Sequence, residues 1–112
     1  MISRETAEHY VWGGNCDGWL LVQAAELSVI HERMPPDRQE VRHYHQQSRQ
    51  FFFVLQGSLT LEVEGATHEL RRHEGYEVAP LQAHQALNRS DAFVEFLVIS
   101  QPRTQGDRIL AP

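Results

Sequence analysis

Short runs of β-branched, aromatic and leucine residues recur along this chain of 112 residues, and no segment shows long helical periodicity. The run SLTLEVE at 58–64 alternates apolar and polar residues, which is typical of a strand with one face in water. Glu64 and Gly65 follow as a predicted hairpin turn. Regularly spaced short strands of this kind predict an all-β sandwich or barrel. The expected strands, about nine, are 19–23, 27–34, 41–45, 50–55, 58–64, 67–71, 76–79, 84–88 and 92–100.

The length of the chain is sufficient for one domain with a modest core, and no linker, repeat or low-complexity segment divides it. We therefore expect a single domain over 1–112. Its two ends, residues 1 to about 8 and 101 to 112, contain few apolar residues in a regular pattern and are expected to be loosely held.

The run QFFFVL is apolar on both faces of its expected strand. Phe52 and Val54 should point to one side, and Phe51, Phe53 and Leu55 to the other. One side should line the core, and the other should meet a second sheet or another subunit. The sequence therefore predicts a homodimer.

Charge and residue usage exclude several classes of function. The formal net charge is −5 and no long basic run is present, which argues against nucleic-acid binding. The ten basic residues are all arginine, so Schiff-base chemistry and a phosphate-loop lysine are excluded. No apolar stretch has membrane-spanning length, the start MISRETAEHY has no secretory pattern, and Cys16 has no second cysteine with which to form a disulfide. We expect a cytoplasmic protein that binds neither nucleic acid nor a membrane.

His43 and His45 are one residue apart in an expected strand. Residues i and i+2 of a strand project from the same face with Cα atoms roughly 6.6 Å apart. Both imidazoles can therefore reach one ion at about 2.1 Å. A His-x-His pair alone is a weak motif, because two strand histidines without a ligand satisfy the same pattern.

The spacing around this pair is similar to the first motif of the cupin superfamily, Gly-x5-His-x-His-x4-Glu-x6-Gly. Here Asp37, His43, His45, Gln50 and Gly57 occupy the five motif positions with every interval kept. Aspartate replaces the first glycine, and glutamine replaces the glutamate.

The second cupin motif, Gly-x5-Pro-x-Gly-x2-His-x3-Asn, is degenerate in this chain. It fits 73–88 without gaps and keeps His84 as its histidine. Ala79 and Leu81 then stand where proline and glycine are usual. A two-residue deletion instead recovers Gly75, and both alignments leave His84 in place. The two motifs and the strands around them resemble a cupin over about 37–100.

The resemblance implies a small jelly-roll β-barrel with His43, His45 and His84 on its inside, binding one divalent transition metal ion. Zinc, nickel, iron, manganese and copper are all compatible with histidine ligands. Gln50 would occupy the position of the usual carboxylate ligand and either bind the ion or a metal-bound water. Because an amide is neutral, the ion would keep its formal +2 charge and favour an anionic, oxygen-rich small molecule.

Glu95 shares a strand face with apolar residues, where an unpaired carboxylate is costly. It should either pair with an arginine or face the cavity as a catalytic base. As an enzyme, the protein would resemble cupin dioxygenases or sugar and keto-acid isomerases. Two alternatives stay open: a non-catalytic small-ligand-binding or sensor cupin, and a metal-free sugar epimerase-like cupin.

Overall fold

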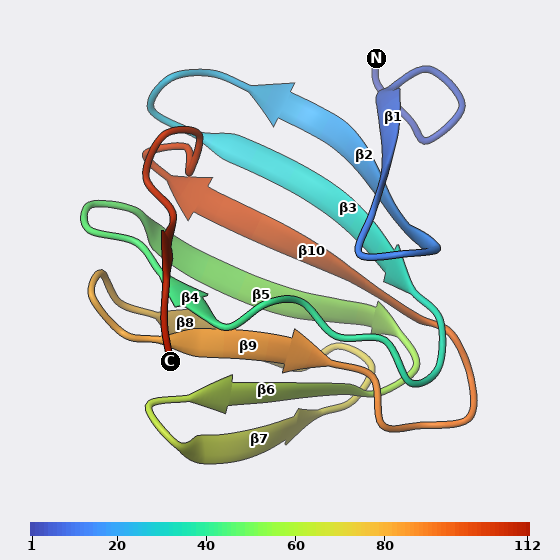
Figure 1. The fold of residues 1–112 in the computed structure, drawn as a ribbon. Coiled ribbons are helices and arrows are strands. Elements are labelled where there is room, and N and C mark those ends of the chain that lie inside the picture. The colour runs from blue at the N-terminus through green and yellow to red at the C-terminus, as the bar shows by residue number, and fades with distance from the viewer.

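The computed structural model describes residues 1–112 and contains eleven strands and no helix (Figure 1). The all-β prediction is confirmed. With no helix present, there is also none that is long and apolar enough to cross a membrane. The strands are β1 (Glu8–Trp12), β2 (Cys16–Gln23), β3 (Ser28–Met34), β4 (His43–Tyr44), β5 (Arg49–Gln56), β6 (Leu59–Val63), β7 (Ala66–Leu70), β8 (Gly75–Val78), β9 (His84–Leu87), β10 (Val94–Gln101) and β11 (Ile109–Leu110).

The strands form two antiparallel sheets (Figure 1). The larger has the order β1-β2-β3-β10-β5-β8, and the smaller has the order β11-β4-β9-β6-β7. The β6–β7 connection is the predicted hairpin, with Glu64 and Gly65 both at positive φ. The chain passes from one sheet to the other between β10 and β11, so the C-terminal segment lies beside β4.

Buried and more exposed side chains alternate along β5, so one face of the strand packs in the core and the other faces outward. Phe52 and Val54 are 3% and 0% exposed and belong to a cluster of 13 buried residues. Their partners on β10, Val98 and Phe96, are buried in the same cluster. Burial of side chains of this size stabilises a fold by about 1.5–3 kcal/mol each.

The outer face of β5 carries the predicted aromatic residues, but neighbouring side chains cover part of it. Phe51 is 39% exposed, whereas Phe53 and Leu55 are half-buried. The ring of Phe53 stacks on Phe51 at 6.2 Å and on His73 at 6.4 Å between centroids. The exposed apolar surface is therefore smaller than the sequence pattern alone indicates.

The prediction of loosely held ends is wrong for the C-terminal segment. Ile109 and Leu110 pair with β4 as β11, and the Ser48 hydroxyl donates a hydrogen bond to the Pro102 carbonyl at 2.6 Å. At the other end, β1 begins at Glu8 and pairs with β2 along its whole length. These two strands account for the difference between the nine expected and the eleven observed.

Three positions where the cupin motifs usually have glycine keep a glycine-like backbone. Asp37, His73 and Leu81 have φ values of 64°, 68° and 73°. Gly57, the last residue of the first motif, has φ 86°, and a Cβ there would lie 2.6 Å from the Phe93 carbonyl oxygen. Gly75, which the alignment with a deletion recovers, lies in β8 without a positive φ. The backbone therefore supports the alignment without gaps.

Candidate metal centre

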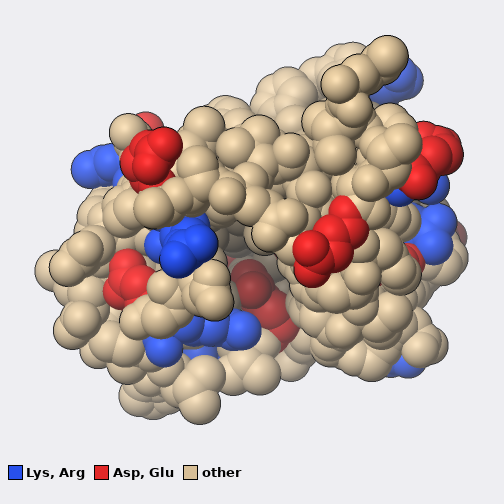
Figure 2. All heavy atoms as spheres, turned by 90° about the horizontal axis from the view of Figure 1, so that it is seen from above, with Lys and Arg blue, Asp and Glu red and all other residues tan.

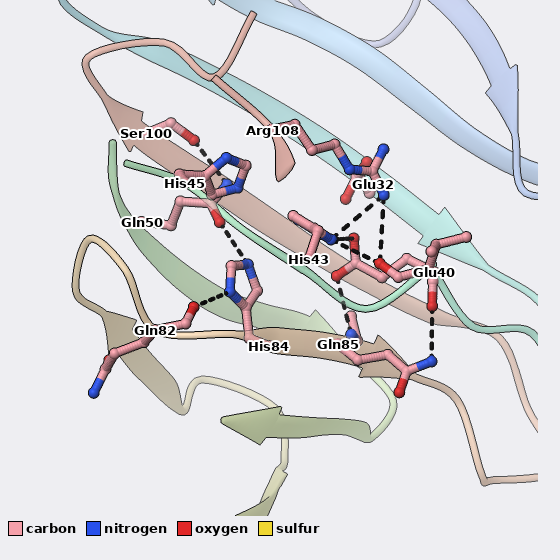
Figure 3. A network of polar contacts seen from close by, with 12 residues as sticks. Glu32, Glu40, His43, His45, Gln50, Gln82, His84, Gln85, Ser100 and Arg108 are labelled. Atoms are coloured by element: carbon pink, nitrogen blue, oxygen red, sulfur yellow. Dashed lines mark hydrogen bonds and ion pairs between the residues drawn. The ribbon is translucent and has the colours of Figure 1, made fainter. Parts of the chain in front are cut away.

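Three histidines from the smaller sheet and its neighbouring loop meet inside the fold (Figure 3). His43 on β4 and His84 on β9 are direct cross-strand partners, which brings their ring centroids to 4.6 Å. His45 follows two residues after His43 and is buried on the same side. Nitrogen atoms of all three rings lie within 4.8 Å of one another. The structure thus brings together the three histidines that the cupin spacing singled out.

Each of the three rings is oriented by a hydrogen bond from Nδ1 to a main-chain carbonyl. A neutral imidazole has one N–H, so a ring that donates through Nδ1 keeps the lone pair on Nε2. Ligand histidines in metal sites are commonly held in this way, because the outer bond fixes both the tautomer and the ring direction. The bonds run from His43 to Val41 (2.7 Å), from His84 to Gln82 (2.9 Å) and from His45 to Asp107.

Gln50 extends the group toward β10. Its amide donates to the Ser100 hydroxyl at 3.1 Å, and its Oε1 lies 2.9 Å from Nε2 of His84. The contact follows from register, because Gln50 and Ser100 are paired across β5 and β10. Among these buried groups, His45 Nε2 has no hydrogen-bond partner.

The donor set fits a divalent transition metal ion. His84 faces two acceptor oxygens, from Gln82 and Gln50, but a neutral ring has a single proton to share between them. A buried nitrogen without a partner is costly, as is the lone pair of His84 opposite an amide oxygen. A cation among His43, His45, His84 and Gln50 would satisfy both, and imidazole nitrogen with amide oxygen suits such ions.

Burial keeps His43 and His84 in the neutral form that metal binding requires. It lowers the pKa of His43 to about 3, and the positive charge of Arg108 acts in the same direction. Burial likewise lowers the pKa of His84. Because a metal must displace a proton from a charged imidazole, a depressed pKa favours metal binding at neutral pH.

A cavity of about 190 Å³ lies against two of the three histidines, His43 and His45. Figure 2 shows one face of the molecule hollowed between two lobes, with acidic side chains in the depth of the hollow. His43, His45 and Gln50 line this cavity together with Glu32 and Tyr10. At about 30 Å³ for each water molecule, the space suits a small metabolite.

Glu32 and Glu40 are acidic cavity residues that were not identified from the sequence. Burial raises the pKa of Glu32 to about 8, with a further contribution from the charge of Glu40. Burial also raises the pKa of Glu40 to about 7, although its carboxylate accepts a hydrogen bond from the Ala86 N–H at 2.9 Å. Both carboxyl groups can therefore exchange a proton near neutral pH.

Gly18 explains how Tyr10 comes to face Glu32. Gly18 lies between the two in the sheet, paired with Tyr10 on one side and with Glu32 on the other. A Cβ at Gly18 would lie 2.3 Å from the Tyr10 ring, so only glycine lets the ring lie across β2. The Tyr10 hydroxyl then reaches to 3.5 Å from the Glu32 carboxylate.

Arg108 brings a positive charge to the same cavity from the C-terminal segment (Figure 3). Its Nη2 lies 3.4 Å from Nδ1 of His43 and 3.5 Å from the Val41 carbonyl oxygen. It forms no ion pair with any carboxylate. The guanidinium is thus available to an anionic group in the cavity.

Glu95 is not brought to the histidines. Residues on β10 alternate, and Glu95 lies on the opposite face from Val94 and Phe96, outside the core. Its carboxylate accepts hydrogen bonds from Arg4 and His31, each at 2.8 Å. The structure therefore gives Glu95 the arginine partner that the sequence offered as one of two alternatives, and the cavity acids are Glu32 and Glu40 instead.

Solved structures share this fold at low sequence identity, while a search of curated proteins gave no match. A sugar phosphate isomerase of the cupin superfamily from Silicibacter pomeroyi has a TM-score of 0.77 and 22% identity, over 92% of this chain and 76% of its own. KdgF from a Halomonas species has a TM-score of 0.84 and 14% identity, over 92% and 93%. A predicted oxalate decarboxylase from Thermotoga maritima has a TM-score of 0.84 and 12% identity, over 92% and 99%.

These likenesses establish the architecture, and the sequence itself identifies the family. The family model described as a cupin domain matches residues 30–100, which include β4 to β9, most of β3 and β10, and the three histidines. With the motif spacing, the two-sheet fold and this match in agreement, the chain belongs to the cupin family.

Proposed function

We propose that this cupin is a metal-dependent enzyme that acts on a small oxygen-chelating metabolite, as an isomerase of the sugar or keto-acid type. The observation that carries the proposal is the set of three buried histidines whose Nδ1 atoms are bonded to main-chain carbonyls. This arrangement leaves three Nε2 lone pairs inside the fold, and that of His84 lies beside the amide oxygen of Gln50. One structural neighbour, from Silicibacter pomeroyi, is a sugar phosphate isomerase, which is consistent with this choice.

His43, His45, His84 and Gln50 would hold the ion, which is zinc, nickel, iron, manganese or copper. When bound, such an ion supplies Lewis acidity that polarises a carbonyl or enolate oxygen. Its charge together with Arg108 would favour an anionic ligand.

Proton movement is assigned to Glu32, which lines the same cavity. An isomerisation through an enolate removes a proton beside a carbonyl and returns it at the neighbouring carbon. A base with a pKa near neutrality is well suited to both steps, and Glu32 has a pKa raised to about 8. Tyr10 donates toward its carboxylate and holds it at the cavity wall. This acid-base equipment favours isomerase over dioxygenase chemistry.

Elemental analysis of untagged protein tests the metal part of the proposal. We expect close to one transition metal ion per chain, largely lost in His45→Ala and His84→Ala. His9→Ala is the matched control, because His9 lies outside the cavity and bonds to Asp17. A metal-free wild type after growth in supplemented medium would favour the epimerase-like alternative and overturn the proposal.

Proton exchange tests the catalytic part. Metal-loaded protein is incubated in D2O with small 2-keto acids, 2-hydroxy acids and keto sugars, and loss of C–H signal is followed by NMR. We expect exchange with at least one compound, and we expect Glu32→Gln to abolish it while metal content is kept. Thermal stabilisation by a compound without any exchange would instead indicate a ligand-binding or sensor cupin.

Two further assignments belong to the proposal. A homodimer would cover the outer face of β5, where Phe51 is exposed beside Phe53. A cytoplasmic location agrees with the single cysteine, Cys16, which is buried and unpaired.

A further inference from the structure

Asp107 contacts the candidate metal centre from outside the segment that the cupin family model matches. That match ends at residue 100, whereas Asp107 lies in the turn before β11. Its main-chain carbonyl accepts the Nδ1–H of His45, which is the only one of the three ring bonds made to a distant part of the chain. Val41 and Gln82, which hold the other two rings, are each two residues from their histidine.

The side chain of the same aspartate binds the loop that follows His45. One carboxylate oxygen accepts the N–H of Gln46 at 2.7 Å, and the other accepts the N–H groups of Gln47 and Ser48, both at 2.9 Å. Although desolvation opposes ionisation, these three hydrogen bonds lower the pKa of Asp107, so the carboxylate is charged at neutral pH. Hydrogen bonds to a charged acceptor are stronger than neutral ones.

The segment that carries Asp107 is itself fixed to β4. The N–H of Asp107 donates to the Thr104 carbonyl at 2.8 Å, and the N–H of Ala111 donates to the Arg42 carbonyl at 3.0 Å. Between these points Ile109 and Leu110 pair with Tyr44 and His43. Asp107 therefore joins a segment that is hydrogen-bonded to β4 with the His45 loop, through two separate groups.

We propose that Asp107 is a positioning residue of the metal centre, which holds the His45 ring through its carbonyl and the His45 loop through its carboxylate. The inference rests on the proposed metal-binding function. Without the carboxylate, residues 46–48 lose three hydrogen bonds, and the distance from His45 to the Asp107 carbonyl is no longer held. Mutation of a residue that hydrogen-bonds to a ligand histidine typically weakens metal binding by about 10- to 100-fold.

Cobalt titration of the full chain tests this inference, with Co²⁺ alone as the probe. Affinity is measured by competition with a chelator, and the visible absorption bands report the ligand geometry. We expect Asp107→Ala to weaken Co²⁺ binding about tenfold and to alter the bands, with Asp107→Asn in between. Asp91→Asn is the matched control, because Asp91 is exposed in the loop before β10 and makes no side-chain hydrogen bond.

Hydrogen exchange of the wild-type chain supplies a second measurement, which does not depend on how the variants fold. Zn²⁺ should slow exchange of the Gln46, Gln47 and Ser48 amides, because Asp107 binds both the His45 ring and these three N–H groups. Variants that fold and bind Co²⁺ within twofold of wild type would overturn the inference, as would unchanged exchange at these amides in zinc-loaded protein. A wild type that binds no metal would overturn the proposed function itself, so the two failures are distinguishable.

Discussion

Leu81 is a residue whose replacement by glycine should stabilise the protein. Its φ of 73° lies in the left-handed region, where an L-residue with a side chain pays roughly 1–2 kcal/mol. Glycine relieves this strain but gives the unfolded chain more freedom, which offsets about 0.5–1 kcal/mol. Leu81 is 65% exposed, so its removal uncovers little core. We expect Leu81→Gly to raise the free energy of unfolding by about 0.5–1 kcal/mol.

Urea denaturation of the metal-free protein, followed by circular dichroism, measures this change. With a slope of about 2 kcal/mol per molar urea, the midpoint should rise by about 0.3–0.5 M. Leu110→Gly is the matched control, because Leu110 is 69% exposed but lies in β11 without a positive φ. It should lower the free energy of unfolding by about 0.5–1 kcal/mol.

The comparison of the two leucines isolates backbone conformation from side-chain loss. The N–H of residue 81 donates to the His45 carbonyl at 2.7 Å, and glycine keeps that bond. A midpoint for Leu81→Gly equal to or below that of wild type would show that position 81 is not strained. It would also remove the physical support for the alignment without gaps.

Three other perturbations have defined outcomes. Since burial raises the pKa of Glu32 from 4.5 to about 8, its carboxyl destabilises the fold increasingly as pH rises between those values. Glu32→Gln should therefore raise the unfolding free energy of metal-free protein by about 2 kcal/mol more at pH 8 than at pH 5, after discounting for solvent in the cavity. Glu26→Gln is the control. Equal gains at both pH values, or the same trend in the control, would contradict this prediction. Gln50→Glu should tighten metal binding by about tenfold or more in a competitive chelator titration, and equal affinity would place residue 50 outside the coordination sphere. Light scattering at micromolar concentration should give twice 12.9 kDa, falling to 12.9 kDa in Phe51→Glu, and a wild-type monomer would refute the dimer.

Local patterns predicted the parts of the site that depend on local geometry. The spacing of His43 and His45 places both on one strand face, and the resemblance to the second cupin motif added His84, which the structure pairs with His43. The alternation in QFFFVL separated Phe52 from Phe51 as the structure does. In each case, the distance that matters is set by neighbouring residues of one strand or by motif spacing.

Contacts between distant segments were the parts that sequence reasoning did not reach. The alternation in SVIHERM places Glu32 on the same face as Ile30, and this signal was available before the structure. The role of Glu32 depends on Tyr10 and Gly18, however. These three residues lie side by side only once β1, β2 and β3 have paired. Asp107 was missed for the same reason, because its partner His45 is 62 residues away.

The hydrogen bond between His45 and the Asp107 carbonyl also determines when the candidate metal centre can be completed during synthesis. A growing chain contains all three imidazoles once residue 84 has been made, whereas the carbonyl that orients one of them is added 23 residues later, with Asp107. Until then the His45 ring can rotate, and either of its nitrogens can carry the proton. A nascent chain that stops between residues 84 and 107 therefore presents an incomplete ligand set, and the finished geometry requires residue 107.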